Sequence, residues 1–398
     1  MQYTGKVLEH FMKPRNVGVI PHADGVGTIG SEDCGDMIRV WIKVVNEHLV
    51  DIKYKVFGCP AAIACCSMMT ELAIGKHVDE AWDLTDDQVA ETLGGLPAHK
   101  YHCSNLAASA LHKAIMNYIF KYPNKTDTIS ITTLIDDIPS ENLRSEHGLS
   151  LLINYGGKRI LFDTGQSDLL LRNAKMLDID FANIDAIVIS HGHYDHTGGL
   201  YDVLNIASKA KIYLHPAATE PKFSKKVSGA KSIGISDSAK KAIQGRDVIW
   251  TTTPAQLFPG IKVTGQVPRM NDYEDVGGAF FLDENCRKPD ELLDDQTLYI
   301  ESAKGLIVVF GCAHSGVVNT LDYIGKSTGQ NKIYAVIGGM HLLNASKIRI
   351  ANTIEAFKKY EVQKVVPLHC TGQGAVENFK NAFGDKCISL ETGNQICF

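Results

Sequence analysis

Two short segments near the start of the chain alternate hydrophobic and polar residues, as the strands of a half-buried antiparallel sheet do. Residues 37–44 (MIRVWIKV) and 49–57 (LVDIKYKVF) flank the polar residues 46–48 and predict a β-hairpin. Residues 61–76 predict a helix that Gly75 ends, and Ser104 is expected to cap a second helix over 105–119, in which apolar residues recur every four positions. This part of the chain therefore predicts a small α+β domain with an antiparallel sheet and helices.

The rest of the chain carries continuous hydrophobic runs, several of which end in a polar motif. Runs of this kind are buried on both faces, so we expect stacked sheets covered by helices, with the motif residues gathered at one end of the sheets. A polar stretch at 121–128 (KYPNKTDT) separates the two patterns, and we place the boundary near Lys125, between domains 1–125 and 126–398. The runs cover residues 148–155, 158–163, 186–190, 211–215, 297–302, 305–311, 333–339 and 364–369.

Composition narrows the class of protein. The chain has 398 residues, of which 44% are hydrophobic and 21% charged, as in ordinary globular proteins of more than one domain. A net charge of -5 disfavours a protein that works by neutralising nucleic-acid phosphates. No apolar stretch is long enough to span a membrane and the first residues do not resemble a signal peptide, so we expect a cytoplasmic protein without membrane contact, whose ten cysteines are reduced thiols.

Three cysteines of the first domain stand at the ends of predicted elements. Cys34 precedes the first strand, Cys59 ends the second strand, and Cys103 opens a helix. A helix N-terminus lowers the pKa of a thiol and favours the thiolate that binds metal. Asp36 and His102 lie within two residues of these cysteines, and the set is compatible with iron–sulfur ligation or with zinc. Any single free cysteine is more often a small buried hydrophobe, an interpretation that best fits Cys65 and Cys66 in a helix interior.

The wider sequence is more specific than the cysteine spacing. The segments MQYTGKVLEHFMKPRNVG, CGDMIRVWIKV, YKVFGCPAAIACCS and GGLPAHKYHCSNLAASAL, in this order, resemble the U-type iron–sulfur cluster scaffolds of the IscU/NifU N-terminal family over residues 1–122. The resemblance implies a domain that takes sulfur from a cysteine desulfurase, builds a labile [2Fe-2S] cluster and passes it to apo iron–sulfur acceptor proteins. It places the cluster-binding residues at Cys34, Asp36, Cys59, His102 and Cys103.

This sequence departs from that family at two points. Cys65 and Cys66 replace its usual serines, where they either add thiols near the site or pack in the core. LPAHK at 96–100 alters the segment that the housekeeping branch presents to its specialised chaperone, so use of that chaperone stays open.

Histidines and an aspartate cluster after a buried strand in the second domain. AIVISHGHYDHTGG places His191, His193, Asp195 and His196 within six residues, which packing alone does not explain. A tight turn can direct His191 and His193 at one metal and the other two at a second. Imidazole with carboxylate suits Zn, Fe or Mn and creates a metal-activated hydroxide for hydrolysis. Further strands end at His314, His341 and His369, Asp163 is placed to orient a ligand, and the isolated His147 and His215 are expected to be structural or solvated.

The H-x-H-x-D-H run, with DTG before it and distant histidine motifs after it, resembles the metallo-β-lactamase superfamily over about residues 128–398. GCAHSG, GGMHL and PLHCTG resemble the branch that contains a dihydropterin ribofuranosylaminobenzene phosphate synthase. The resemblance implies an αββα sandwich with two divalent metals, one held by His191, His193 and His314 and the other by Asp195, His196 and His369. Many relatives carry a bridging aspartate where this chain has GGMHL, so His341 either replaces it as a ligand or contacts substrate, and a mononuclear site stays open. Asp195 and His341 are the candidate catalytic residues.

The glycine motif GVGTIG at 25–30 matches a dinucleotide-binding spacing, but no helix follows it, and we reject that interpretation. We therefore interpret the chain as an iron–sulfur scaffold fused to a metal-dependent hydrolase for a small phosphorylated or sulfur-containing substrate, assembled as a homo-oligomer. The alternative is a metallo-hydrolase that the cluster domain regulates or uses as a redox sensor. Residues 217–247 and 266–297, which carry no motif, are expected to set substrate specificity.

Overall fold

The computed structural model describes residues 3–31, 36–45, 47–121, 129–227 and 229–398. The chain divides into two compact units, Met1–Asn124 and Lys125–Phe398, and each is described by itself. Among the described residues, no helix is both long enough and apolar enough to cross a lipid bilayer.

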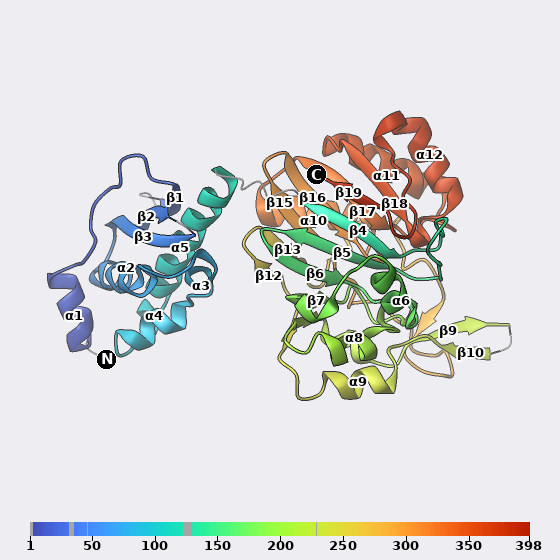
Figure 1. Ribbon diagram of the computed structural model, residues 1–398, viewed down its shortest axis with the longest axis horizontal. Helices are drawn as coiled ribbons and strands as arrows, with labels where there is room; N and C mark the ends of the chain where they lie inside the picture. The colour runs from blue at the N-terminus through green and yellow to red at the C-terminus, as the bar shows by residue number, and fades with distance from the viewer. Residues whose placement is uncertain (1–2, 32–35, 46, 122–128, 228) are drawn as a thin grey trace. The chain divides into compact units, whose positions relative to one another are not determined.

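The first unit is a small α+β domain, as the sequence predicts. Its antiparallel sheet has the order β1 (Gly25–Ser31), β2 (Asp36–Val45), β3 (His48–Phe57), and β2 with β3 form the predicted hairpin. The helices are α1 (Gly5–Met12), α2 (Pro60–Ala73), α3 (Val78–Trp82), α4 (Asp86–Thr92) and α5 (His102–Lys121). α2 ends just before Gly75, which takes a positive φ of 85°. α5 packs on β1 and β2, and α2 packs on β3 and α5 (Figure 1).

One sequence prediction for this unit was wrong. Ser104 does not cap α5, because the helix already begins at His102 and the Ser104 hydroxyl donates to the Tyr101 carbonyl inside the first turn. The glycine motif at 25–30, for which the sequence predicts no element, lies in strand β1. At Gly25 and Gly27 an added Cβ would overlap the carbonyl oxygens of Ala114 and Ala110, so glycine lets β1 approach α5 closely.

The second unit is an αββα sandwich of two mixed sheets, which confirms the predicted fold class. Each of the eight hydrophobic runs found in the sequence contains a strand. The first sheet has the order β11 (Val248–Trp250), β8 (Lys211–Leu214), β7 (Ala186–Val188), β6 (Lys158–Phe162), β5 (Ser150–Tyr155), β4 (Ser130–Ile135), β19 (Gln395–Cys397). The second has the order β12 (Ala255–Phe258), β13 (Ile261–Val263), β15 (Leu298–Ser302), β16 (Gly305–Phe310), β17 (Ile333–Gly339), β18 (Lys364–Leu368).

Alternate residues of the buried strands face different hydrophobic layers. On β16, Ile307 and Val309 pack between the two sheets, whereas Leu306, Val308 and Phe310 pack under the outer helices. The helices of this second layer are α10 (Val317–Thr328), α11 (Lys347–Lys359) and α12 (Gln373–Phe383). The first sheet is covered in the same way by α6 (Leu169–Met176), α8 (Leu200–Ile206) and α9 (Asp237–Ile243) (Figure 1). Burial on both faces explains why these strands read as continuous apolar runs.

A smaller sheet lies outside the sandwich. Its order is β10 (Gly229–Ser232), β9 (Phe223–Lys226), β14 (Phe280–Phe281), and all its pairs are antiparallel. These strands come from 217–247 and 266–297, the two segments that the sequence analysis singled out for specificity.

Candidate cluster site and metal centre

In the first unit the candidate cluster residues come from three element ends. Cys59 is the N-cap of α2, with Pro60 at the first helical position, and Asp36 begins β2. His102 and Cys103 begin α5. The Cys59 and Cys103 sulfurs are 3.6 Å apart, and His102 Nε2 lies 3.5 Å from the Cys103 sulfur and 3.6 Å from Asp36 Oδ2. Cys34 lies outside the described residues.

The Cys103 thiol is protonated more readily than a free thiol. Burial raises the pKa of Cys103 to about 12, and the hydrogen bond to Cys59 adds to the shift. The pKa of Lys100 is raised, chiefly by its proximity to Cys59. Cys65 and Cys66 are fully buried in the core of the unit, and burial raises the pKa of both thiols. These two cysteines therefore pack in the core.

In the second unit, the loop after β7 and the short helix α7 (Tyr194–Thr197) bring the predicted residues together. His191 Nε2 lies 2.9 Å from His193 Nδ1, and the ring of His314, which follows β16, is 4.8 Å from the ring of His191. Burial lowers the pKa of His191 and His314 well below the usual range, and neighbouring histidines add to the shift. Neutral imidazole is the form that binds metal.

The other three predicted ligands meet beside them. Asp195 Oδ2 lies 3.7 Å from His196 Nε2 and 3.4 Å from Nε2 of His369, which follows β18. Burial alone would raise the pKa of Asp195, but the two histidines hold it well below its usual range. Within the described part of the chain, Nε2 of His314 and Nε2 of His369 are buried and have no hydrogen-bond partner. Buried nitrogens of this kind are costly unless a cation takes them, so the donor set fits divalent metal.

Carboxylates outside these two sets hold the histidine rings. Asp163, at the end of β6, accepts from His196 Nδ1 at 2.6 Å and from the Ser190 amide. Asp137, after β4, lies 2.8 Å from His369 Nδ1 and 3.1 Å from His147 Nδ1. Such contacts fix the tautomer and orientation of a metal-binding histidine.

His147 and His215, both expected to be structural or solvated, differ in their surroundings. His147 is half exposed, but its Nε2 lies 3.4 Å from Asp195 Oδ2, so it stands at the rim of the site. His215 is buried, and its Nδ1 accepts from the Ala217 amide. Asp137 and His147 were missed as site residues, because no short spacing links them to the histidine motifs.

The surroundings of His341 are consistent with either predicted role, metal ligand or substrate contact. Its Nε2 donates to the Gly277 carbonyl at 3.1 Å, and its ring lies 4.3 Å from the ring of His314. Nδ1 is buried without a partner among the described residues. His341 and His369 take positive φ values of 43° and 46°, a strained backbone that concentrates at functional sites.

Two cysteines also line this centre, although the sequence analysis assigned them no role. Cys312 follows β16 and Cys370 follows His369, and their sulfurs lie 3.2 Å apart. The Cys312 sulfur is also 3.2 Å from His196 Nε2. Their position inside the motifs GCAHSG and PLHCTG, close to the candidate ligands, is the sequence feature that could have indicated a role at this site.

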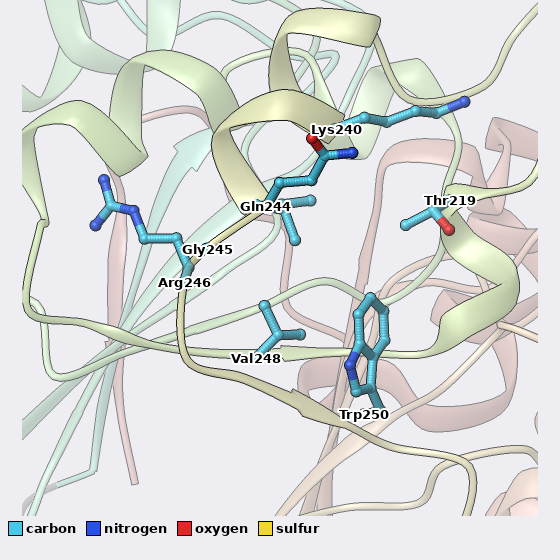
Figure 2. Close-up of a pocket in the computed structure, with 8 residues that line it drawn as sticks. Thr219, Lys240, Gln244, Gly245, Arg246, Val248 and Trp250 are labelled. Atoms are coloured by element: carbon cyan, nitrogen blue, oxygen red, sulfur yellow. The ribbon is translucent and has the colours of Figure 1, made fainter.

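A cavity of about 430 Å³ opens onto the histidines, and Asp195, Cys312 and Asn344 are among the residues that line it. The small outer sheet contributes Lys226, Lys231 and Phe280 to its wall. A second hollow of about 370 Å³, formed by α9, β11 and the loop between them, is shown in Figure 2. Its lining residues include Lys240, Arg246 and Trp250 but none of the predicted site residues.

Comparison with known proteins divides the chain in the same way. Residues 2–125 match the NifU-like N terminal domain family, and residues 144–282 match the metallo-beta-lactamase superfamily. The chain is 55% identical over 127 residues to the iron-sulfur cluster assembly scaffold protein IscU 1 of Archaeoglobus fulgidus, covering 32% of this chain and 82% of that protein.

It is also 37% identical over 295 residues to the 7,8-dihydropterin-6-methyl-4-(beta-D-ribofuranosyl)-aminobenzene-5'-phosphate synthase of Methanocaldococcus jannaschii, covering 69% of this chain and 98% of that protein. A crystal structure of a metal-dependent hydrolase of the β-lactamase superfamily matches with a TM-score of 0.59 at 32% identity, covering 67% of this chain and 98% of that one.

Proposed function

Because the chain belongs to the NifU-like N-terminal family in its first unit and to the metallo-β-lactamase superfamily in its second, we propose an iron–sulfur cluster scaffold joined to a metal-dependent hydrolase. One observation carries the proposal: each unit gathers its own set of metal-binding side chains. Ligand atoms of Asp36, His102 and Cys103 lie within 4.8 Å of one another in the first unit, and so do those of His191, His193 and His314 in the second.

In the first unit the proposed cargo is a labile [2Fe-2S] cluster. Cys34, Cys59 and Cys103 are its proposed thiolate ligands, and Asp36 and His102 supply an oxygen and a nitrogen. A cysteine desulfurase would deliver the sulfur, and apo acceptor proteins would receive the cluster. The hard carboxylate of Asp36 suits a site that must release its cargo, because it binds iron less firmly than thiolate does.

Asp36→Ala should make the cluster longer-lived and slower to transfer, whereas Cys59→Ser should abolish assembly. We would reconstitute the full chain anaerobically with iron and sulfide, and follow transfer to an apo-ferredoxin by visible absorption. Cys397→Ser, which alters an exposed thiol of the other unit, is the matched control and should behave as wild type. Unchanged transfer in Asp36→Ala would argue against a role for Asp36 in release, and full assembly in Cys59→Ser would argue against the site.

In the second unit we propose two divalent metals, with Zn, Fe or Mn as candidates. His191, His193 and His314 would hold one, and Asp195, His196 and His369 the other. When bound, the metals supply Lewis acidity and lower the pKa of a water molecule. Asp163 and Asp137 keep the rings of His196 and His369 in the orientation that leaves Nε2 facing the centre.

The cavity wall supports the proposed substrate class. Lys226 and Lys231 line the cavity that reaches the histidines, and both side chains are exposed, so they can meet an anionic group. Phe280 adds an apolar surface to the same wall. We therefore favour a small phosphorylated molecule with an apolar or aromatic part, with His341 as a further contact or ligand and Asp195 as the proposed catalytic carboxylate.

His193→Ala and Asp195→Ala should lose bound metal and any phosphodiesterase activity, while His215→Ala should keep both. Metal per chain would be measured by mass spectrometry, and activity with bis-p-nitrophenyl phosphate. Retention of full metal and full activity in Asp195→Ala would refute the binuclear assignment. For His341→Ala, loss of metal would identify a ligand, and loss of turnover with metal retained would identify a substrate contact.

We also propose that 1–125 and 126–398 fold independently, since each unit has hydrophobic clusters made only of its own residues. Each fragment expressed alone should give a cooperative thermal transition and bind its own metal. An insoluble or metal-free 126–398 fragment would contradict this division.

A further inference from the structure

The centre of the second unit contains two thiols that the proposed metal ligands leave unused. Cys312 is 2% exposed and stands in the loop after β16, and Cys370 stands after β18. Their sulfurs lie 3.2 Å apart, although 58 residues separate them in the sequence. The Cys370 sulfur accepts a hydrogen bond from the backbone amide of His341 at 3.2 Å. The Cys312 sulfur lies 3.2 Å from His196 Nε2.

Cys312 reaches both sets of proposed ligands. Its sulfur lies within 4.8 Å of ligand atoms of His191 and His196, within that distance of His314 and His341, and again of His369 and Cys370. His191 and His314 belong to the first proposed metal, and His196 and His369 belong to the second. An atom this close to ligand atoms of both sets meets the proximity that a bridging ligand requires.

The charge of the centre also calls for a bridging anion. Asp195 is the only carboxylate among the six proposed ligands, and the turn 338–341 (GGMH) beside them contains none. The carboxylates of Asp163 and Asp137 are already engaged by His196 Nδ1 and His369 Nδ1. Two divalent cations about 4 Å apart repel each other strongly inside a protein unless an anion lies between them.

We propose that the thiolate of Cys312 bridges the two metals of this centre, in place of a bridging carboxylate. The inference rests on the proposed function of the second unit and identifies a seventh ligand. On metal loading the Cys312 S–H bond would break and its proton would leave to solvent. The sulfur would keep the bonding electron pair as a thiolate with three lone pairs, of which it would donate one to each ion. Cys370 is the positioning residue, because its sulfur contacts both Cys312 and the His341 amide. A sulfur bridge favours Zn, Fe or Co over Mg and Ca.

Cobalt(II) reports thiolate ligands directly, through a sulfur-to-cobalt charge-transfer absorption in the near ultraviolet. The full chain would carry Cys34→Ser, Cys59→Ser and Cys103→Ser, so that the first unit contributes no thiolate signal. After chelation, this background is titrated with Co(II), and metal per chain is measured alongside the spectrum. We expect two cobalt ions and a charge-transfer band, both unchanged by the control Cys397→Ser.

Adding Cys312→Ser to the background should remove the charge-transfer band and one of the two metal ions. Adding Cys370→Ser instead should keep the band. Cys312→Asp should bind two ions again but show no band. A band that survives Cys312→Ser, or that disappears only in Cys370→Ser, would overturn the bridge. If the triple-serine background binds two cobalt ions but shows no charge-transfer band, the thiolate bridge is refuted and the proposed metal site stands. If the background binds no metal, both the bridge and the proposed function of the second unit are refuted. If Cys312→Ser fails to fold, cobalt X-ray absorption of the triple-serine background tests the bridge instead. A bridging thiolate requires a sulfur neighbour at both cobalt ions.

Discussion

Lys222 is a buried cation on which the loop of the metal centre depends. Only 1% of its side chain is exposed, and its Nζ lies 2.9 Å from Asp290 Oδ2 and 2.8 Å from Asp294 Oδ1. The other oxygen of Asp294 accepts the Gly192 amide at 2.7 Å, between the two histidines of the H-x-H motif. Lys222→Met keeps most of the side-chain volume and leaves two buried carboxylates without their cation.

Removing one partner of a buried ion pair costs about 3–5 kcal/mol, because the remaining charge is neither paired nor hydrated. For a unit of this size, 1 kcal/mol shifts Tm by about 2–4 °C, so we expect Tm of the second unit to fall by about 6–20 °C. Burial alone would raise the pKa of Asp294, but Lys222 outweighs it and holds that pKa below its usual range. A carboxylate with a lowered folded pKa stabilises the fold above its unfolded pKa and loses that contribution as the pH falls.

Without Lys222 the buried carboxylates bind protons more tightly when folded, so the variant loses stability as the pH rises. The difference in Tm between wild type and Lys222→Met should therefore be larger at about pH 7.5 than at about pH 5. Differential scanning calorimetry of the full chain would resolve the transition of each unit. Lys262→Met is the matched control: its Nζ bonds Glu301 Oε1 at 2.7 Å, but 28% of the Lys262 side chain is exposed, so about 0–1 kcal/mol is expected. Equal Tm shifts in the two variants, or a pH dependence of opposite sign, would refute the reasoning.

Two further predictions follow from the contacts described above. Asp163→Asn should weaken metal binding by about 10–100-fold, because it disturbs the hydrogen bond that orients His196. Chelator competition would measure the affinity, and Asp237→Asn, at an exposed position in the first turn of α9, should leave it unchanged. Gly27→Ala should destabilise the first unit by about 1–3 kcal/mol, because its methyl group would overlap the Ala110 carbonyl on α5. Gly5→Ala, whose methyl group would meet no atom, should leave Tm equal or higher, and equal Tm values for both alanine variants would contradict the packing argument.

The sequence predicts the long buried strands and misses the elements that depend on distant partners. Runs such as 305–311 are recognised because both faces of the strand are apolar, a property of the segment itself. Strand β1 carries three glycines in seven residues and has no such pattern. It forms because β2 pairs with it and α5 packs on it. Strands β9 and β10, with four charged or hydroxyl side chains exposed between them and no apolar alternation, are missed for the same reason.

The residues of the candidate site also fall into those that a local sequence pattern reveals and those that only the fold brings together. His191, His193, Asp195 and His196 are found from the sequence because they lie within one short turn. Asp137 contacts His369 across 232 residues, and no local pattern encodes that approach. Cys312 and Cys370 stand inside recognised motifs, but only the folded chain brings their sulfurs together. Whether a thiol at a strand end packs, bridges or coordinates depends on what the opposite sheet places beside it.

The histidines of the second unit come from both sheets of the sandwich. His191, His193 and His196 follow β7 of the first sheet, whereas His314 and His369 follow β16 and β18 of the second. A cation bound by both groups of histidines would cross-link the two sheets at one edge, as a disulfide joins two distant segments of a chain. Opening of the sandwich at that edge would then require the ion to leave first. The amides at the ends of β7 and β18 would consequently exchange their hydrogens at rates set by free metal concentration, while those near the opposite edge would not.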